Sequence, residues 1–310
     1  MILGLDVLIG LAVLSLGASV INGGLGYGYS SLSIPLALLV VVNRIINPVY
    51  VAVEACTNTV MLGFSGRSNI RATFKRVLPL IGALIPGVIV GSLLLSTASP
   101  AWVRFFVYAS ILPLILLQAS GVRRPIDEER SAAIPFGAGA GVLYAVTTVS
   151  GPPIALFWNN QGLVKSEFKA AIAQIRIAES YVTCLSYYLL GLFTVGTLQL
   201  FSWIAPPVIV GIPLGIFTVR RVQVEIFRRI CMSFDAWIVG YGFAVVLGTL
   251  FHLINVGYAI WAIVLGIDAV LLYRFFKSRT LRARFSIVGK LDPLRRDPAG
   301  QVDSSRDANG

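Results

Sequence analysis

The sequence predicts an all-α membrane protein made of two five-segment halves and one additional C-terminal helix. Three observations lead to this fold class. Apolar side chains make up 56% of the 310 residues and charged ones only 13%, with a mean hydropathy of +0.83, which is too apolar for a soluble domain of this length. The apolar residues gather in runs of membrane-spanning length. The pattern of the first half also returns in the second half.

Eleven apolar runs follow one another along the chain, and most approach the about 20 residues that a helix needs to cross a bilayer. Two runs, 29–42 and 152–163, are shorter, and each follows a longer run, 2–22 or 132–149, after a break. We expect two broken hairpins that enter the membrane without crossing it; the alternative is that both cross a locally thinned bilayer. The expected full spans are residues 48–66, 77–98, 102–120, 168–192, 198–219, 229–250 and 255–274.

The Lys and Arg residues predict how these segments are oriented. The connections at 99–101, 193–197 and 251–255 contain neither residue type. Basic residues occupy the alternate connections, which places them on one side, the cytoplasmic side under the positive-inside rule. The net charge of +11 therefore reflects membrane orientation, and we expect no nucleic-acid partner. The basic stretches contain Arg67, Arg71, Lys75 and Arg76; Arg123, Arg124 and Arg130; Lys165 and Lys169; Arg220, Arg221, Arg228 and Arg229; and the tail from Arg274.

The two halves repeat at an offset of about 125 residues. Gly87-x-x-x-Gly91 corresponds to Gly211-x-x-x-Gly215, and both read as close-packing faces between helices. Each half holds five segments. Because five is an odd number, the second copy is expected to be inverted relative to the first, as in many secondary transporters.

Two breaks in the apolar runs are the candidate binding elements. One is Ser150-Gly151-Pro152-Pro153, and the other is the glycine-rich stretch that ends in Gly28-Tyr29-Ser30-Ser31. A helix that starts inside the membrane presents free backbone N–H groups and a positive dipole end, which attract an anion. We therefore expect both breaks to meet near the midplane around one anion site. The candidate substrate-binding residues are Gly28, Tyr29, Ser30, Ser31, Ser150, Gly151, Pro152 and Arg176.

Ionisable residues inside the apolar runs are the candidate coupling groups, because such residues are costly in a bilayer and normally face a cavity or a partner. Arg176 and Glu179 share one helical stripe; Arg176 either holds an oxyanion, with Glu179 orienting it or carrying a proton, or the two neutralise each other. Glu54 has no basic partner on its own run and is a candidate for proton coupling or for a structural hydrogen bond. Asp235 and Asp268 are further acids without an evident partner.

No motif indicates an enzyme or a cofactor. Walker A, HExxH and GxGxxG patterns are absent from the sequence. Gly63-Phe64-Ser65-Gly66 is similar to the GxSG of intramembrane serine proteases, but the only histidine, His252, is expected at the opposite face. We therefore expect no enzymatic activity, no cofactor and no metal.

The breaks resemble known signatures. The second break and the residues after it resemble the second-repeat signature of the TauE/SafE family of sulfite and organosulfonate exporters: Gly151-Pro152-Pro153, Gly162-Leu163 and Lys165-x-Glu167-Phe168-Lys169-Ala170. The first break with Pro35 resembles the first-repeat signature, although Gly28-Tyr29-Ser30-Ser31 stands where many members have consecutive glycines. Phe227-Arg228-Arg229-Ile230 is similar to the start of the last conserved helix. The resemblance covers roughly residues 10–250 and implies a carrier for small sulfur-containing or organic anions, commonly an exporter.

These expectations define one organisation. Residues 1–121 form a first membrane repeat, 122–131 a cytoplasmic loop, 132–250 a second membrane repeat, 251–275 an additional transmembrane helix and 276–310 a basic, partly disordered cytoplasmic tail. We expect a secondary transporter that moves a small anion by alternating access, in the bacterial inner membrane with a cytoplasmic C-terminus. An anion channel, or a membrane scaffold or sensor that works through the tail, are the alternatives, and a homo-oligomer is left open.

Overall fold

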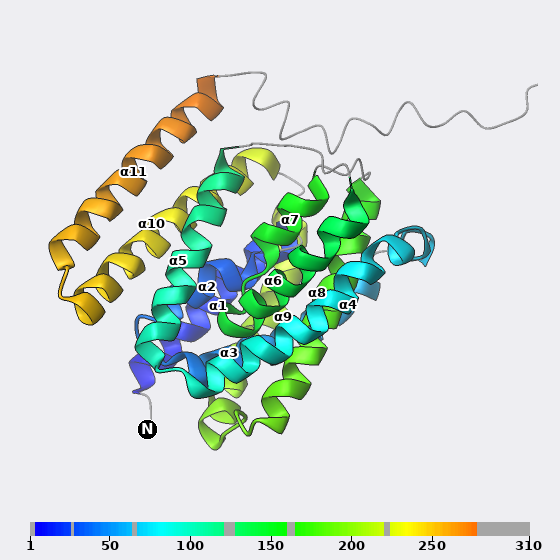
Figure 1. Ribbon diagram of the computed structural model, residues 1–310, viewed down its shortest axis with the longest axis horizontal. Coiled ribbons are helices and arrows are strands. Elements are labelled where there is room, and N and C mark those ends of the chain that lie inside the picture. The colour runs from blue at the N-terminus through cyan, green and yellow to red at the C-terminus, as the bar shows by residue number, and fades with distance from the viewer. Residues whose placement is uncertain are drawn as a thin grey trace, which may run out of the picture.

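The described part of the chain is helical throughout. The computed structural model describes residues 4–25, 28–63, 67–120, 128–159, 165–219 and 224–277, and within these ranges it contains eleven helices and no strand (Figure 1). The predicted all-α membrane fold is confirmed. The 276–310 tail beyond Lys277, most of the 122–131 loop, and Arg220 and Arg221 lie outside the described residues.

Each predicted apolar run contains one helix. The largest difference is α4, which begins at Arg67 rather than near residue 77, because its polar first turns continue the helix toward water. The helices are α1 (Leu5–Leu25), α2 (Tyr29–Ala37), α3 (Asn43–Gly63), α4 (Arg67–Thr97), α5 (Pro100–Ala119), α6 (Glu129–Thr147), α7 (Gly151–Asn159), α8 (Lys165–Leu189), α9 (Val195–Val219), α10 (Val224–Phe251) and α11 (Ile254–Lys277).

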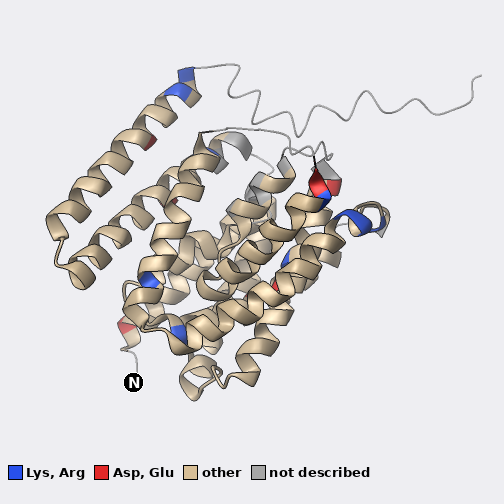
Figure 2. Cartoon of the chain, viewed as in Figure 1, with Lys and Arg blue, Asp and Glu red and all other residues tan. Residues whose placement is uncertain are grey.

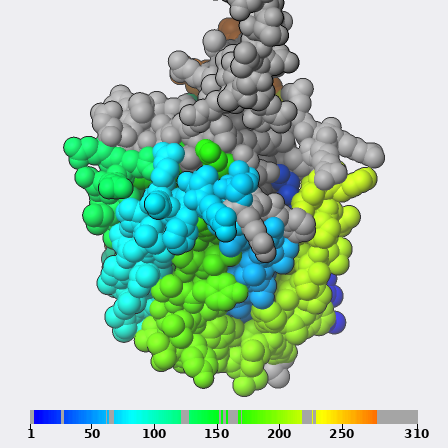
Figure 3. Space-filling view, turned by 90° about the vertical axis from the view of Figure 1, so that its right-hand side faces the viewer, coloured from blue at the N-terminus to red at the C-terminus, as the bar shows by residue number. Residues whose placement is uncertain are grey.

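Six described helices, α1, α4, α5, α9, α10 and α11, are long and apolar enough to cross a membrane. α3 and α8 were also predicted to span. They have 21 and 25 residues, which is long enough, but they are less apolar because they carry the charged residues of the interior. The two helices pack against each other. Figure 3 shows the face on which α3, α4, α8 and α9 lie side by side. The polar stripes of α3 and α8 therefore face neighbouring helices and not lipid.

The contacts between helices form a repeated pattern, and the division of the chain into two halves stays a prediction. α4 packs along α6, and α1 packs along α9, which is the same pairing with the halves exchanged. α3 packs on α8, and α5 packs on α10, so that helices at equivalent positions of the two predicted halves contact each other. Two equivalent halves would produce this exchange. Their inverted orientation stays a prediction.

The two predicted glycine faces are close-packing surfaces, and this expectation is confirmed. A Cβ atom at Gly87 would overlap the carbonyl oxygen of Ala138 on α6, and one at Gly215 would overlap the carbonyl oxygen of Val20 on α1. Backbone atoms cannot move aside as a flexible side chain can. Glycine at these positions therefore sets the close approach of α4 to α6 and of α9 to α1.

Gly87→Val is expected to destabilise the protein strongly, because the added side chain must push α6 away from α4. Overpacking a well-packed interior typically costs about 1–3 kcal/mol, and a backbone neighbour leaves little room for relaxation. Gly82→Val on the same helix is the matched control, since nothing lies within 4 Å of a Cβ atom at Gly82. Thermal unfolding of the detergent-solubilised variants measures the difference. Equal melting temperatures for the two variants would contradict this packing account.

The basic ends of the helices gather on one side of the molecule. The starts of α4 and α6 and the end of α11 lie toward the upper and right-hand side, whereas the connections at 98–99, 190–194 and 252–253 lie on the opposite side (Figures 1 and 2). Arg44 and Arg104 are exceptions. Arg44 donates to the carbonyls of Leu95 and Ala98 at the end of α4, and Arg104 donates to that of Val41. Arginines that cap helix ends in this way do not report orientation.

Candidate functional site

A buried ion pair joins α3 and α8. Arg176 Nη2 of α8 lies 2.7 Å from Glu54 Oε1 of α3, and the two side chains are 4% and 1% exposed. Both residues lie on polar stripes, and the packing of α3 on α8 turns these stripes toward each other. The partner of Arg176 is therefore Glu54 from the other half and not Glu179, which the local spacing had suggested as the neutralising residue.

The ion pair is completed by hydrogen bonds from neighbouring helices. Tyr144 of α6 donates its hydroxyl to Glu54 Oε2 at 2.8 Å. Asn58 donates its amide to the backbone carbonyl of Arg176 at 3.4 Å. Each carboxylate oxygen of Glu54 thus has a donor, which offsets part of the cost of burying a charge.

Ser150 of the second break is the hydrogen-bond partner of a second buried acid, Glu179. Ser150, immediately before α7, donates its hydroxyl to Glu179 Oε2 at 2.6 Å, while Glu179 Oε1 is buried without a partner. Thr148 ends α6 with φ 58°, in the left-handed region that favours glycine. Gly151 and Pro152 form the first turn of α7, and the Pro152 side chain lies outside the described part. The carboxyl group of Glu179 therefore lies at the start of α7, where a negative charge is favoured.

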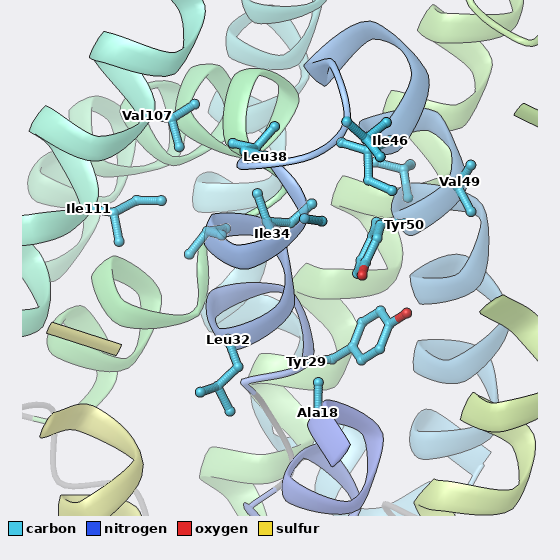
Figure 4. Packing of buried hydrophobic residues seen from close by; sticks show 14 of the residues in the cluster. Ala18, Tyr29, Leu32, Ile34, Leu38, Ile46, Val49, Tyr50, Val107 and Ile111 are labelled. Atoms are coloured by element: carbon cyan, nitrogen blue, oxygen red, sulfur yellow. The ribbon is translucent and has the colours of Figure 1, made fainter. Parts of the chain in front are cut away.

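The first break approaches the same centre through Tyr29. Gly28 has φ 106°, which permits the turn into α2, and Tyr29, Ser30 and Ser31 are all buried. The Tyr29 ring stacks on that of Tyr50, with centroids 5.1 Å apart (Figure 4). Tyr29 Oη is buried without a partner and lies close enough to Glu54 to interact electrostatically.

The four ionisable groups of this region form one centre. Tyr144 interacts electrostatically with Glu54, Glu179 and Arg176. Glu179 also interacts electrostatically with Arg176 and Glu54. We call Glu54, Tyr144, Ser150, Arg176 and Glu179 the polar centre. In the described part of the chain, no cluster of His, Cys, Asp and Glu gathers to hold a metal ion. The centre offers a guanidinium, two carboxylates and two hydroxyls, a set suited to binding an oxyanion and to holding protons.

Comparison with known proteins decides the family. The family model described as sulfite exporter TauE/SafE matches residues 11–242, three quarters of the chain. The chain belongs to the TauE/SafE family. The matched span contains both breaks and every residue of the polar centre, whereas α11 lies beyond it. No curated protein and no solved structure gives a significant match. The protein is an integral membrane transporter, and membership of a transporter family agrees with the expectation that it is not an enzyme.

In this TauE/SafE protein, a group of unpaired buried polar atoms lies on α3, on α8 and at Thr148 before the second break. A buried polar group without a partner costs about 1–3 kcal/mol, so that these unpaired atoms need an explanation. Passage of a polar ligand is one. The unpaired atoms are Asn43 Nδ2 and Oδ1, Asn47 Oδ1, Thr148 Oγ1, Arg176 Nε, Glu179 Oε1 and Thr183 Oγ1.

Asn43 and Asn47 were not among the predicted site residues of the TauE/SafE protein. Both are fully buried on α3, and Asn47 donates to the carbonyl of Val146 at 2.7 Å. With Tyr50, Glu54 and Asn58 they are spaced i, i+4, i+7, i+11 and i+15, a stripe along one face of a helix. That spacing is visible in the sequence, but the expected segment began at residue 48 and left the two asparagines out.

A second buried ion pair holds α11, the helix outside the TauE/SafE match. Arg229 of α10 lies 2.8 Å from Asp268 Oδ1 of α11, and both side chains are fully buried. Trp237 donates its indole N–H to Asp268 Oδ2 at 3.0 Å. Asp268 thus has a structural role in attaching α11, and its partner came from a different predicted segment.

Proposed function

We propose that this TauE/SafE transporter exports a small anion, such as sulfite, an organosulfonate or a related organic acid, by alternating access around the polar centre. The observation that carries the proposal is the buried ion pair between Arg176 and Glu54, one residue from each half. A charge pair that joins the two moving parts of a carrier can be broken and remade during each cycle.

Arg176 is the proposed anion ligand. Its Nη2 contacts Glu54, while its Nε donor is buried without a partner. A guanidinium offers five N–H donors in a planar fork that matches two oxygens of a sulfonate or carboxylate. The start of α7 beside Ser150, and Tyr29 at the first break, are the proposed further contacts of the anion, together with Gly28, Ser30, Ser31, Gly151 and Pro152.

Glu54 is the proposed link between anion and proton. While Glu54 is ionised it occupies Arg176, and an incoming anion would place a second negative charge on the same guanidinium. Protonation of Glu54 removes this competition, so that anion and proton bind together. Glu179, with one unpaired oxygen, is the proposed second acceptor. Outward transport then proceeds when the cytoplasmic excess of the anion exceeds any opposing proton gradient.

The test uses the purified full-length protein. A thermal-shift screen against sulfite, ethanesulfonate, thiosulfate, sulfoacetate, taurine and simple carboxylates is expected to show stabilisation by at least one anion. In proteoliposomes, unlabelled anion inside should then accelerate uptake of labelled anion from outside. With the membrane potential clamped at zero by equal potassium and valinomycin, a channel shows no such acceleration, and its appearance under these conditions would exclude the channel alternative. Absence of both stabilisation and exchange for every anion in the panel would refute the proposal.

Removal of residues 278–310 is expected to leave transport unchanged, because every residue of the polar centre precedes α11. Truncation after Lys277 keeps the whole of α11, including buried Phe275. The measurement is the initial rate of anion exchange in proteoliposomes, with the amount of reconstituted protein as the control. Loss of exchange in the truncated protein would favour the alternative in which the basic tail is the working part.

The proposed location is the bacterial inner membrane, with the basic helix ends and the C-terminus on the cytoplasmic side. The gathering of basic ends on one side of the molecule supports this orientation. Accessibility of single introduced cysteines in the 98–99 connection and after Lys277 is expected to differ between intact cells and inverted vesicles. Labelling of both positions from the same side would contradict the proposed orientation.

A further inference from the structure

Asp235 is a buried acid in the membrane that the polar centre does not use. It lies on α10, 11 residues after the helix begins at Val224, which is about 16 Å along the helix axis. The residue is 7% exposed, and its Oδ1 is buried without a hydrogen-bond partner. Such a group inside a membrane normally has a function or a partner.

The carboxyl group of Asp235 faces the first break. Because α2 packs against α10, the Ser31 hydroxyl, which donates to the carbonyl of Gly28 at 3.2 Å, lies within electrostatic reach of this carboxyl group. α2 packs against α10, and Ser31 belongs to the first turn of α2. Asp235 thus lies at the N-terminal end of one broken helix, just as Glu179 lies at the N-terminal end of the other. Each of the two helices that start inside the membrane faces one buried carboxyl group.

No basic residue in the described part of the chain compensates Asp235. The described titratable group that interacts with it is the Cys231 thiol, one turn earlier on α10. From the packed neighbours, α2 contributes the Ser31 hydroxyl; Tyr108 of α5 donates to the carbonyl of Pro35, and Asp268 of α11 is engaged with Arg229. An isolated buried carboxylate is expensive, and such a group neutralises itself by taking up a proton.

We propose that Asp235, with Ser31, is a second proton-binding site of the transport cycle, placed at the start of α2. This inference rests on the proposed anion transport. The carboxylate accepts one proton from water on the side to which the first break opens, forming an O–H bond, and returns that proton to water after the carrier has switched sides. The positive end of α2 favours the ionised form, and burial favours the protonated form.

The first readout is transport of labelled ethanesulfonate, whose own charge does not vary with pH, by full-length protein in proteoliposomes. Asp235→Asn is expected to lower the proton-gradient-driven accumulation ratio to the smaller value that the single proton at Glu54 supports, and to reduce exchange much less. Asp6→Asn, which removes an exposed acid near the start of α1, is the control and should behave as wild type. Asp235→Glu, which restores the acid, should regain accumulation. Unchanged accumulation in Asp235→Asn would overturn the proposal.

The second readout does not require transport. The infrared difference spectrum of the protein between acidic and alkaline buffer is expected to contain a carboxylic-acid C=O band that Asp235→Asn removes and Asp6→Asn retains. Failure of exchange by the wild type would refute the proposed function, while this band would still test the proton site. A band of full intensity in Asp235→Asn would overturn the assignment of a proton to this site. The same assignment would fail if accumulation depended on sodium and Asp235→Asn abolished that dependence without altering the band.

Discussion

Arg176→Lys is expected to lower anion transport about 10- to 100-fold while leaving the fold intact. A lysine ammonium can still reach a carboxylate by a single contact, and the ion pair with Glu54 is one Nη2–Oε1 contact of 2.7 Å. It cannot present two parallel N–H groups to two oxygens of an anion. A lost hydrogen bond to a charged group costs about 1.5–3 kcal/mol, and each 1.4 kcal/mol is a factor of about ten.

The matched control is Arg76→Lys. Arg76 forms a two-oxygen pair with Glu129 between α4 and α6, away from the polar centre. The same change there tests whether loss of an arginine fork in general disturbs the protein. Exchange of labelled ethanesulfonate in proteoliposomes and the melting temperature in detergent are measured for both variants. Equal exchange rates for Arg176→Lys and wild type would remove Arg176 from the anion site.

The sequence predicted the fold class and the residues of the site, but it did not predict which of these residues contact each other. The apolar runs and the two breaks predicted the helices, and the rarity of charges in such runs selected Glu54, Arg176 and Glu179. Helical spacing, however, determines only which residues of one helix share a face. It favoured Glu179 as the local partner of Arg176, whereas the packing of α3 on α8 brings in Glu54 from 122 residues away.

Helical spacing also could not predict the partners of the two other buried acids, Asp268 and Asp235. Arg229 and Asp268 lie on separate helices, and their contact depends on how α11 packs on α10. Asp235 lies near Ser31 because the short helix α2 packs against α10. A pairing of this kind requires the three-dimensional arrangement of short and long helices. The sequence indicates the buried charge, and the fold determines its partner.

An anion carrier gains from having a carboxylate beside its arginine. An exporter must return empty, and a lone guanidinium in the membrane interior is costly to carry across the switch. Glu54 and Arg176 together form a neutral pair in the empty carrier, and an anion bound to Arg176 beside a protonated Glu54 keeps this pair neutral in the loaded carrier. Tyr144 keeps Glu54 in place in either state, since its hydroxyl contacts the oxygen that Arg176 leaves free. On this account, Glu54 controls both affinity and coupling.

Glu54→Gln is therefore expected to bind the anion more tightly and to transport it more slowly. The amide keeps an oxygen that can accept from Arg176 or Tyr144, but it no longer competes as a charge. Anion affinity should rise about tenfold, equivalent to about 1.4 kcal/mol, and should become independent of pH, because the anion no longer competes with a carboxylate for Arg176. Net transport should decrease because the empty carrier now holds an uncompensated Arg176.

Binding of ethanesulfonate, followed by calorimetry in mildly acidic and mildly alkaline buffer, separates these expectations from a structural role. Glu129→Gln, which removes the partner of Arg76 outside the centre, should bind as wild type at both pH values. If Glu54 only stabilised the fold, Glu54→Gln would lower the melting temperature and leave the affinity and its pH dependence unchanged. Tighter and pH-independent binding, combined with slower net transport, is the pattern that only displacement of the Glu54 carboxylate by the anion produces.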